Sequence, residues 1–484
     1  MDPPRRGEFS AAERAAARSV SSNRRGHVFE LQLGHLCNNR CVFCSSGRLT
    51  EAGLARPVDA EAIFRALDEA RASGARRVVF LGGEPTLHRH FLDAVRHAVR
   101  IGFEDLVIFT NGVTLPRPGF VEAVAALGRF EWRISIQGAT EAAHVAVTRR
   151  PASFRRIVAG LEKLSSLGQR ITANVCVTRE NAASLPGYPA LVERYGIRQL
   201  HVDIVRPEST GLEDLSALGA VMPRYSELAP HLDAMLRAFE ARALDVEVRV
   251  GNLPYCVLPE WPAAIHHGGE ETVTVASDTE GLEAAVDKYG WHRSLRTHLP
   301  QCEHCALRRE CTGVFRAYLA RYGDGEFRPV ALEAVEALPP ARRPFGLLLA
   351  HAAAAWLAAA GCPPRPWVLR GREEDRRSRA WTYAQPAGAG WITVRLLSPE
   401  QVAARPLAPD GAPVVHRDRH VAVALVVDPE VPPAARMRLI AFVGRHLGFD
   451  PRTALLQIDV RHRTLGYHGP RHRAAGGVPT SPRR

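Results

Sequence analysis

Residues 37–44 read Cys37-Asn38-Asn39-Arg40-Cys41-Val42-Phe43-Cys44 and follow an apolar run at residues 28–33 that predicts a β-strand. Three of the nine cysteines in the chain fall within these eight residues. A short loop can turn three thiolates inward, and thiolates select iron–sulfur clusters, zinc or copper(I). The sequence therefore predicts a metal-binding loop directly after the first strand.

The choice of metal follows from the number of ligands. A structural zinc site takes four ligands, and no fourth cysteine or suitably spaced histidine follows within the next fifty residues. His35 is adjacent, but a single neighbouring histidine makes a poor zinc finger. A cluster of four irons on three thiolates leaves one iron open for chemistry. We therefore favour an iron–sulfur cluster, with a structural zinc loop as the alternative.

Length and composition indicate a soluble protein of two or three domains. A chain of 484 residues is too long for one ordinary core, and 46% hydrophobic with 24% charged residues is typical of globular proteins. Residues 1–26 lack the apolar core of a secretory signal, and the Ala-rich run 345–361 is too short to span a membrane. The cysteine count is odd and argues against a disulfide framework. We expect a cytoplasmic protein without a membrane partner.

The net charge of +12 is concentrated near the C-terminus, where residues 331–484 hold 22 Arg against 12 Asp plus Glu. A basic segment of this kind can meet an acidic peptide or a nucleic acid. However, only Lys163 and Lys288 are lysines among the 63 basic residues, which indicates a GC-rich coding bias. A nucleic-acid partner therefore stays an alternative that the sequence does not favour.

Between residues 28 and 242, short apolar runs alternate with helical patterns, which predicts an α/β fold with a parallel sheet and right-handed crossovers. Six strands are too few for a closed eight-stranded barrel. Ligands bind at the carboxyl ends of such strands. The strands are predicted at 28–33, 77–81, 106–109, 132–136, 171–177 and 199–205, and the helices near 59–73, 88–101, 120–127, 153–167, 185–195 and 225–242.

Polar groups gather at the ends and on one face of these strands. Gly82-Gly83-Glu84 follows the second strand, where glycines permit positive φ and close backbone approach and a carboxylate can accept hydrogen bonds from an ammonium group. Thr110-Asn111-Gly112 follows the third strand. Alternation in the later strands places a polar set on the barrel interior, namely Ser135, Gln137, Thr172, Asn174, Cys176, His201 and Asp203.

The cysteine gaps of three and two residues, the aromatic Phe43 before the last cysteine, and Gly82-Gly83-Glu84 downstream together resemble the radical S-adenosylmethionine (radical SAM) superfamily. The resemblance covers residues 27–245 and implies a partial (β/α)6 barrel. It implies a [4Fe-4S] cluster on Cys37, Cys41 and Cys44 whose open iron is chelated by SAM. An external one-electron reductant of flavodoxin or ferredoxin type, cleavage of SAM to a 5′-deoxyadenosyl radical, and hydrogen abstraction from a substrate are implied with it.

The same resemblance implies which residues touch SAM. Phe43 packs near the adenine, and Gly82, Gly83 and Glu84 receive the ammonium. The alternative for each remaining polar residue is a structural hydrogen bond, and Cys176 is expected to be an inert inward thiol. The remaining cofactor contacts are Asn111, Ser135, Gln137, Arg149 and Asn174.

A second cysteine group lies beyond the barrel and consists of Cys256, Cys302, Cys305 and Cys311. Four thiolates can close a zinc site or a second, auxiliary [4Fe-4S] cluster, and spacing alone does not separate these metals. After a radical SAM barrel, the two-then-five spacing resembles the auxiliary-cluster region of SPASM/twitch relatives. Only Cys362 follows, so the resemblance implies one twitch-like cluster and not the two of a full SPASM domain.

The chain is therefore divided into a disordered lead-in (1–26), a radical SAM core (27–245), an auxiliary-cluster region (246–330), a small α+β domain (331–467) and a disordered basic tail (468–484). The α+β domain follows a Pro-rich seam. Its helices are predicted at 345–360 and 433–447, and its strands near 391–396, 420–427 and 455–460.

Relatives with such an auxiliary region often modify peptides, so the resemblance implies a peptide-modifying radical SAM enzyme. The N-terminal segment is too short for the leader-binding domain of many such enzymes, which leaves a C-terminal element to bind the peptide. One alternative is a small-molecule, sugar or nucleotide-derived substrate. Another is a non-catalytic iron–sulfur or zinc-binding protein, which would have no use for an ammonium acceptor at Gly82-Gly83-Glu84.

Overall fold

The computed structural model describes residues 28–207, 215–267, 272–277, 282, 286–308 and 310–339, and then 342–344, 349, 353, 356–357, 367–374, 378–384, 390–397, 422–427, 431–432, 434, 438, 441–442, 455–459 and 464–468. The chain divides into two compact units, Met1–Ala331 and Leu332–Arg484. The predicted lead-in, nearly all of the predicted tail and most of the helices predicted at 345–360 and 433–447 lie outside the described residues.

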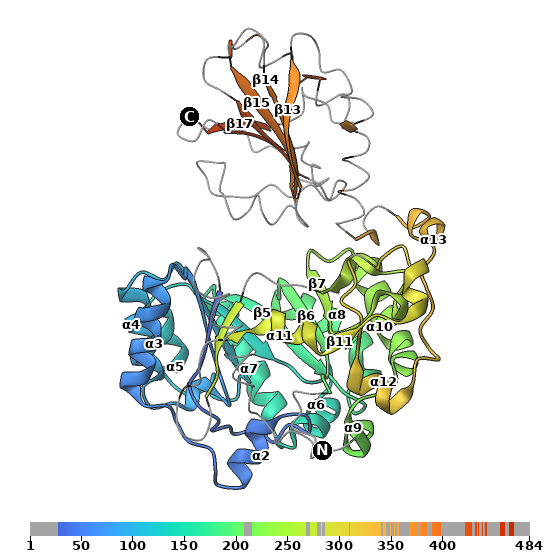
Figure 1. Cartoon of the computed structure of the whole chain (residues 1–484). Helices are drawn as coiled ribbons and strands as arrows, with labels where there is room; N and C mark the ends of the chain where they lie inside the picture. Colours follow the sequence, from blue (N-terminus) through green and yellow to red (C-terminus); the bar gives the residue numbers. More distant parts are fainter. Residues whose placement is uncertain are drawn as a thin grey trace, which may run out of the picture. The chain divides into compact units, whose positions relative to one another are not determined.

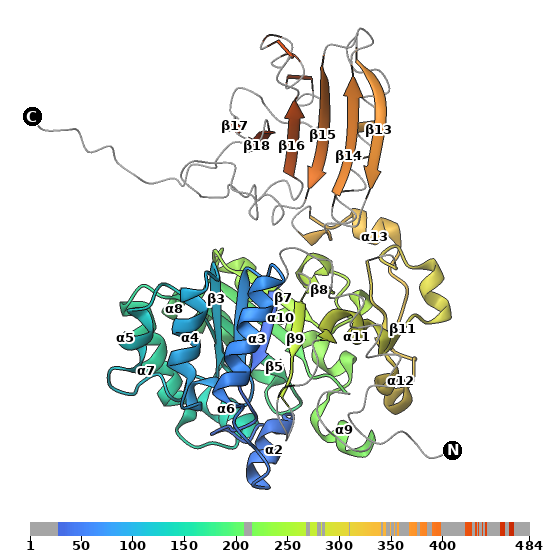
Figure 2. The same ribbon diagram turned by 60° about the vertical axis from the view of Figure 1, so that its left-hand side comes forward.

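The first unit is built on a sheet in which six strands follow one another in chain order, each parallel to the next. This confirms the predicted α/β fold with a parallel sheet. Figures 1 and 2 show the helices packed around the outside of this curved sheet. The strands are β1 (Val28–Gln32), β2 (Arg77–Leu81), β3 (Asp105–Thr110), β4 (Glu131–Ser135), β5 (Arg170–Val177) and β6 (Gln199–Ile204).

Helices link successive strands and bury their apolar faces against the sheet. Helix α3 begins at the N-cap Asp59, whose side chain accepts from Glu61 N, and it buries Ile63 and Leu67 completely. Each such side chain contributes about 1.5–3 kcal/mol through burial. Up to residue 241, the described helices of this unit are α2 (Ser45–Glu51), α3 (Ala60–Ala72), α4 (Phe91–Arg100), α5 (Phe120–Ala125), α6 (Glu141–Thr148), α7 (Ser153–Ser166), α8 (Tyr188–Tyr195), α9 (Leu215–Val221) and α10 (Tyr225–Ala241), with 3-10 turns η1 (Pro85–Leu87) and η2 (Ala182–Gly187).

The sheet is wider than the sequence predicts. Strands β7 (Glu247–Gly251) and β8 (Ile265–His266) extend it beyond β6, while β9 (Thr272–Val275) and β10 (Val286–Asp287) extend it beyond β1. Strand β9 pairs in parallel with β1, so residues 272–275 lie beside residues 28–31. β8 and β10 have two residues each, too few for a periodic signal, whereas β7 (EVRVG) and β9 (TVTV) alternate over only four residues and were not predicted.

The end of the first unit carries the second cysteine group on short elements. These include a two-stranded antiparallel sheet of β11 (Arg296–Thr297) and β12 (Val314–Phe315). The other elements are η3 (Tyr255–Val257), η4 (Pro262–Ala264), α11 (Lys288–Ser294), η5 (Pro300–His304) and α12 (Arg316–Tyr322).

The second unit contains α13 (Leu332–Glu336) and an antiparallel sheet in the order β13-β14-β15-β16-β18-β17. The buried Trp356 donates its indole N–H to the Tyr383 hydroxyl at 2.9 Å, which ties it to this sheet. Strands appear where the sequence predicts them at β15, β16 and β17, whereas β13, β14 and β18 were not predicted. The strands are β13 (Val368–Glu374), β14 (Ser378–Ala384), β15 (Trp391–Leu397), β16 (Ala422–Val427), β17 (Leu455–Asp459) and β18 (Thr464–His468). Within the described residues, no helix has both the length and the hydropathy to cross a membrane.

Candidate active site

The loop of residues 37–44 is held against the end of α6 by its own backbone. Arg40 N donates to Thr148 O at 2.9 Å and Val42 N donates to Val147 O at 3.0 Å. The Arg40 guanidinium also donates to the carbonyl oxygen of Cys37 at 2.7 Å. These bonds fix the loop without using the thiols, which stay available as ligands.

The three thiols of this loop are free and half-buried, and they lie close enough together to repel each other as thiolates. Burial, together with the charges of Glu84 and Cys44, raises the pKa of Cys37 to about 12. Burial also raises the pKa of Cys41 well above its ordinary value, with added repulsion from Cys44 and Cys37. Buried thiolates that repel each other require a cation, so this donor set fits an iron–sulfur cluster.

Two N–H groups point at the Cys37 sulfur. Asn39 N donates to Cys37 Sγ at 3.4 Å, and Asn111 Nδ2 donates to it at 3.7 Å from the end of β3. Both bonds favour the thiolate form and thereby oppose the rise in the pKa of Cys37. Asn111 therefore lies at the loop, where the sequence places a cofactor contact.

The two glycines after β2 fit against the backbone that leads into the cysteine loop. Gly82 has φ of +137°, and Gly83 N donates to Gly34 O at 2.8 Å. A Cβ atom on Gly83 would collide with the carbonyl oxygens of His35 and Leu36. The close approach that these glycines permit is thus to the protein's own chain, and their contact with SAM stays a prediction.

The Glu84 side chain is buried at 3% exposure and accepts four hydrogen bonds. Its Oε1 accepts from Thr86 N at 3.1 Å, Thr86 Oγ1 at 2.5 Å and Thr110 Oγ1 at 2.6 Å, and its Oε2 accepts from Asn111 N at 2.7 Å. Burial raises the pKa of Glu84, while these donors lower it. Its predicted bond to the SAM ammonium stays a prediction, because every donor described here belongs to the protein.

The inward side chains of the later strands form rows across the sheet. Ser135 stands beside Asn174, and Gln137 Oε1 accepts from Cys176 N at 2.9 Å. Asn174 Nδ2 in turn donates to Asp203 Oδ2 at 2.9 Å. The structure therefore brings the predicted contacts Ser135, Gln137 and Asn174 together, although Gln137 and Asn174 already have protein partners.

Asp203 is a site residue to which the sequence assigned no role beyond facing inward. The register runs Cys176, Asp203, Gly251 and His266 across β5, β6, β7 and β8. A Cβ atom on Gly251 would collide with Asp203 Oδ1, so the glycine makes room for this carboxylate. Burial raises the pKa of Cys176, and the charges of Asp203, Arg206 and Cys44 also act on it. Cys176 therefore lies between the cysteine loop and Asp203.

The two remaining predicted contacts border the loop. Phe43 is half-buried between Cys41 and Cys44. Arg149 is exposed and ends α6 with φ of +50°, directly after the Thr148 carbonyl that holds the loop. Their contacts with SAM stay predictions.

The four cysteines of the second group converge, although Cys256 is 46 residues from Cys302. Burial, together with repulsion from Cys311, Cys305 and Cys302, raises the pKa of Cys256 to about 12. Gly313 N donates to Cys311 Sγ at 3.3 Å. Among the residues described, no three or more His, Cys, Asp or Glu side chains have the close spacing of a site for a single metal ion.

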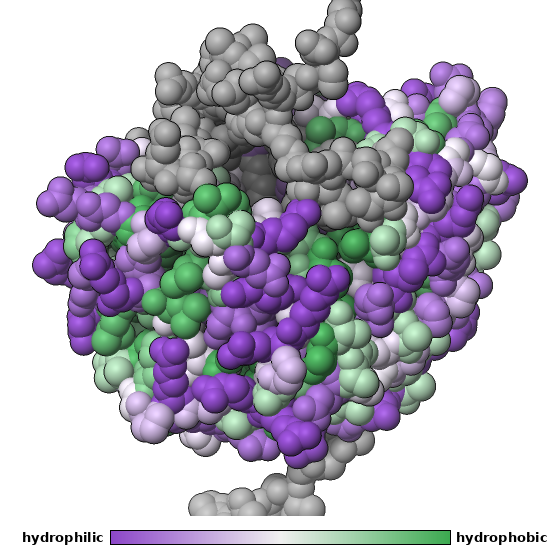
Figure 3. All heavy atoms as spheres, turned by 90° about the horizontal axis from the view of Figure 1, so that it is seen from below, coloured by the Kyte–Doolittle hydropathy of each residue, from purple (hydrophilic) through white to green (hydrophobic). Residues whose placement is uncertain are grey.

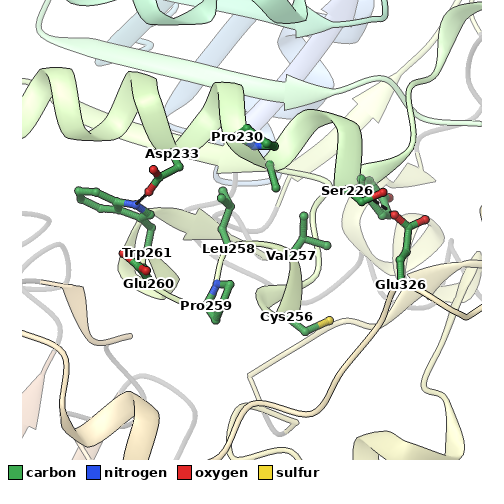
Figure 4. A pocket seen from close by; sticks show the side chains of 12 residues that line it. Ser226, Pro230, Asp233, Cys256, Val257, Leu258, Pro259, Glu260, Trp261 and Glu326 are labelled. Carbon is green, nitrogen blue, oxygen red and sulfur yellow. Dashed lines mark hydrogen bonds between the residues drawn. The ribbon is translucent and has the colours of Figure 1, made fainter.

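A pocket of about 430 Å³ adjoins this second group, between α10 and the segment from η3 to η4 (Figure 4). Cys256 lines it together with apolar side chains such as Leu258 and Trp261. Trp261 Nε1 donates to Asp233 Oδ1 at 2.8 Å, which fixes one wall of the pocket.

Figure 3 shows the surface of the first unit on the side of α2, where small patches of hydrophobic residues are interspersed among hydrophilic residues.

Residues 31–186, which contain the cysteine loop, Glu84, Asn111 and the inner rows up to β5, match the family model of the radical SAM superfamily. This match to residues 31–186 confirms the resemblance of this part of the chain that was read from the sequence.

Curated relatives match over this part of the chain. A "PqqA peptide cyclase" of Xanthomonas campestris pv. campestris is 29% identical over 207 residues, covering 42% of this chain and 53% of the relative. A "Probable GTP 3',8-cyclase" of Saccharolobus solfataricus is 28% identical over 182 residues, covering 37% and 58%. The chain thus spans little more than half the length of these relatives. The solved structure of Streptococcus suis SuiB bound to S-adenosylmethionine has a TM-score of 0.47 at 15% identity, covering 65% of this chain and 79% of SuiB.

Proposed function

We propose that this protein is a radical SAM enzyme in which Cys37, Cys41 and Cys44 hold a [4Fe-4S] cluster and SAM binds beside it. The observation that carries the proposal is the convergence of three half-buried cysteines, whose thiolates would repel one another, at the strand ends of a radical SAM domain. A cluster held by these residues would supply one electron to the sulfonium of SAM, whose C5′–S bond would break to give methionine and a 5′-deoxyadenosyl radical able to abstract a hydrogen atom from the substrate.

The residues of this chain position the reaction and enclose it. The backbone bonds of Arg40 and Val42 keep the loop in place, and the inner row with Cys176 and Asp203 bounds the space next to it. We assign SAM to Phe43, Arg149 and the strand ends that carry Asn111 and Ser135. The electron comes from an external reductant of flavodoxin or ferredoxin type. A reducing compartment, the cytoplasm, suits the eight described cysteines, all of them free thiols.

We further propose that Cys256, Cys302, Cys305 and Cys311 hold an auxiliary [4Fe-4S] cluster. Their mutual repulsion and the N–H bond on Cys311 support this assignment over inert thiols. Four thiolates leave no iron open, so the group serves electron transfer and does not bind substrate. Zinc is the alternative occupant, since it takes the same four ligands.

A peptide is the substrate that we propose. The relative named "PqqA peptide cyclase" and the auxiliary cysteine group both support it. A nucleotide-derived small molecule is the second candidate, supported by the relative named "Probable GTP 3',8-cyclase".

Iron content and SAM cleavage test the two clusters separately. Anaerobically reconstituted protein should carry about eight irons per chain, and Cys41→Ala and Cys256→Ala should each retain about four. With dithionite and SAM, Cys256→Ala should still form 5′-deoxyadenosine, whereas Cys41→Ala should form none. Cys176→Ala is the matched control for removal of a thiol outside both groups and should keep about eight irons.

The contradicting results are equally distinct. An iron-free wild type after reconstitution would refute the enzyme. A content of about four irons together with zinc would show that the second cysteine group holds zinc and not an auxiliary cluster. For the substrate, mass spectrometry should find deuterium transferred from labelled peptides to 5′-deoxyadenosine, while transfer from labelled GTP and not from peptides would favour the second candidate.

A further inference from the structure

The Glu84 carboxylate is buried and accepts four hydrogen bonds from the protein itself. An ionised carboxylate offers about four acceptor positions. Two backbone N–H groups and two threonine hydroxyls donate to Glu84, from Thr86, Thr110 and Asn111. The side chain is 3% exposed. Oε1 accepts three of these bonds and Oε2 only the one from Asn111 N, so a further donor would find its acceptor position on Oε2, where the burial of Glu84 restricts access by a ligand.

Asn111 links this carboxylate to the cysteine loop. Its backbone N–H donates to Glu84 Oε2 at 2.7 Å, and its side-chain Oδ1 accepts from Val113 N at 3.1 Å. The remaining amide hydrogens go to Asn38 Oδ1 at 2.6 Å and to Cys37 Sγ at 3.7 Å. The Asn111 side chain is therefore held in one orientation, with an N–H directed at a sulfur of the loop.

We propose that Glu84 is a positioning residue for the iron–sulfur loop, acting through Asn111 on the Cys37 sulfur, and that it is not the acceptor of the SAM ammonium. The proposal rests on the proposed function, since it requires a cluster on Cys37. It assigns to Asn111 the tuning of that cluster.

The physical effect is on the reduction potential. A reduced cluster carries more negative charge on its sulfur atoms, so an N–H donor stabilises the reduced form and raises the potential. Removal of the Asn111 amide should therefore lower the midpoint potential of the cluster on Cys37. A residue with only a packing role in the strand end would leave the potential unchanged.

Two variants and a control distinguish a role in positioning the iron–sulfur loop from a role in binding the SAM ammonium. Glu84→Gln removes the charge and keeps the size of the side chain, and Asn111→Ala removes the N–H donor. Glu131→Gln is the matched control, because Glu131 is also a buried carboxylate of the same sheet, but at the start of β4 and paired with Arg77 and Arg133. Cys256→Ala is combined with each, so that only the cluster on Cys37 is observed. SAM affinity is measured by equilibrium dialysis, and the midpoint potential by a redox titration followed by electron paramagnetic resonance.

We expect Asn111→Ala to lower the potential and Glu84→Gln to bind SAM within about threefold of the parent. Loss of a charge-assisted bond to the ammonium would instead weaken SAM binding by about tenfold to a hundredfold. That weakening in Glu84→Gln, or an unchanged potential in Asn111→Ala, would overturn the inference. If Glu84→Gln does not fold, the potential of Asn111→Ala decides alone. An iron-free parent would overturn the proposed function together with this inference. If the parent loads iron, a failure concerns only the roles assigned to Glu84 and Asn111, and the proposed function stands.

Discussion

Gly83 shows how little freedom single residues have next to the cysteine loop. The carbonyl oxygens of His35 and Leu36 occupy the space that a side chain would need. Its N–H is bound to Gly34 O, so the strand end cannot move away without losing that bond. The position of the loop therefore depends on a residue that carries no chemistry itself.

Gly83→Ala should lower the free energy of unfolding of the metal-free protein by about 1–3 kcal/mol, because the added methyl overpacks a rigid backbone contact. Anaerobic urea denaturation measures the loss. Gly325→Ala is the control, since Gly325 is exposed and a Cβ there meets nothing within 4 Å. Equal free energies of unfolding for Gly83→Ala and Gly325→Ala would contradict the steric clash expected at Gly83.

At the scale of single residues, the sequence points to candidate site residues more readily than it predicts their hydrogen-bond partners. Cys37, Cys41 and Cys44 are recognisable because their spacing is local. The partners of Glu84 are not, because Thr110 and Asn111 come from the next strand and meet it only after the sheet has formed. Asp203 was placed on the interior by alternation, but its bond to Asn174 depends on the register of β5 and β6.

Helix α6 accepts hydrogen bonds from the cysteine loop at its C-terminal end and carries a buried histidine. His144 is 0% exposed, and its Nδ1 accepts from Gln137 N at 3.0 Å, so the proton of the neutral ring is on Nε2. Burial lowers the pKa of His144 to about 4. The folded protein thus keeps this ring neutral at pH values where an unfolded chain would protonate it.

The stability of the protein should therefore fall as the pH falls from about 6.5, the unfolded value, to about 4, because the unfolded state binds the extra proton in that window. This one residue contributes about 3 kcal/mol to the change. His144→Gln should have a flatter pH dependence of its urea midpoint than the wild type between pH 7 and 4.5. Parallel curves for the two proteins would show that His144 does not titrate as described.

Whether an element is predictable depends on its length. β1 to β6 were predicted within a few residues because each has at least five residues that form either a mostly apolar run, as in β2 and β3, or an alternation of apolar and polar residues, as in β6. A single helix was predicted from His88 to Ile101, whereas the structure has the 3-10 turn η1 starting at Pro85 and then α4 from Phe91. β8 and β10 have two residues each, too few for any periodic pattern.

At the scale of the whole chain, all seven cysteines of the two groups belong to the unit Met1–Ala331. A chain ending at Ala331 should therefore load about eight irons and form 5′-deoxyadenosine with dithionite and SAM. Iron analysis and chromatography of the product check this. An iron-free truncated chain beside an iron-loaded full-length protein would show that the second unit contributes to cluster binding.

The alternation of strands and helices predicts the fold of the radical SAM core because βαβ units form from neighbouring segments. It does not predict that residues 272–275 return to pair with β1, because this contact joins distant segments and a pattern within a short window carries no signal for it. The approach of Cys256 to Cys302, Cys305 and Cys311 was instead predicted from the residue type, since four thiolates can share one metal site.

The pairing of β1 with β9 also has a consequence for biosynthesis. The outer edge of the first strand has no partner until residue 275 has left the ribosome, 243 residues after β1 ends at Gln32. At about 5–20 residues per second, translation of that length takes roughly ten to fifty seconds. Throughout this time the nascent chain carries an open sheet edge that can pair with other chains, and chaperones that mask such edges should improve the yield of soluble protein.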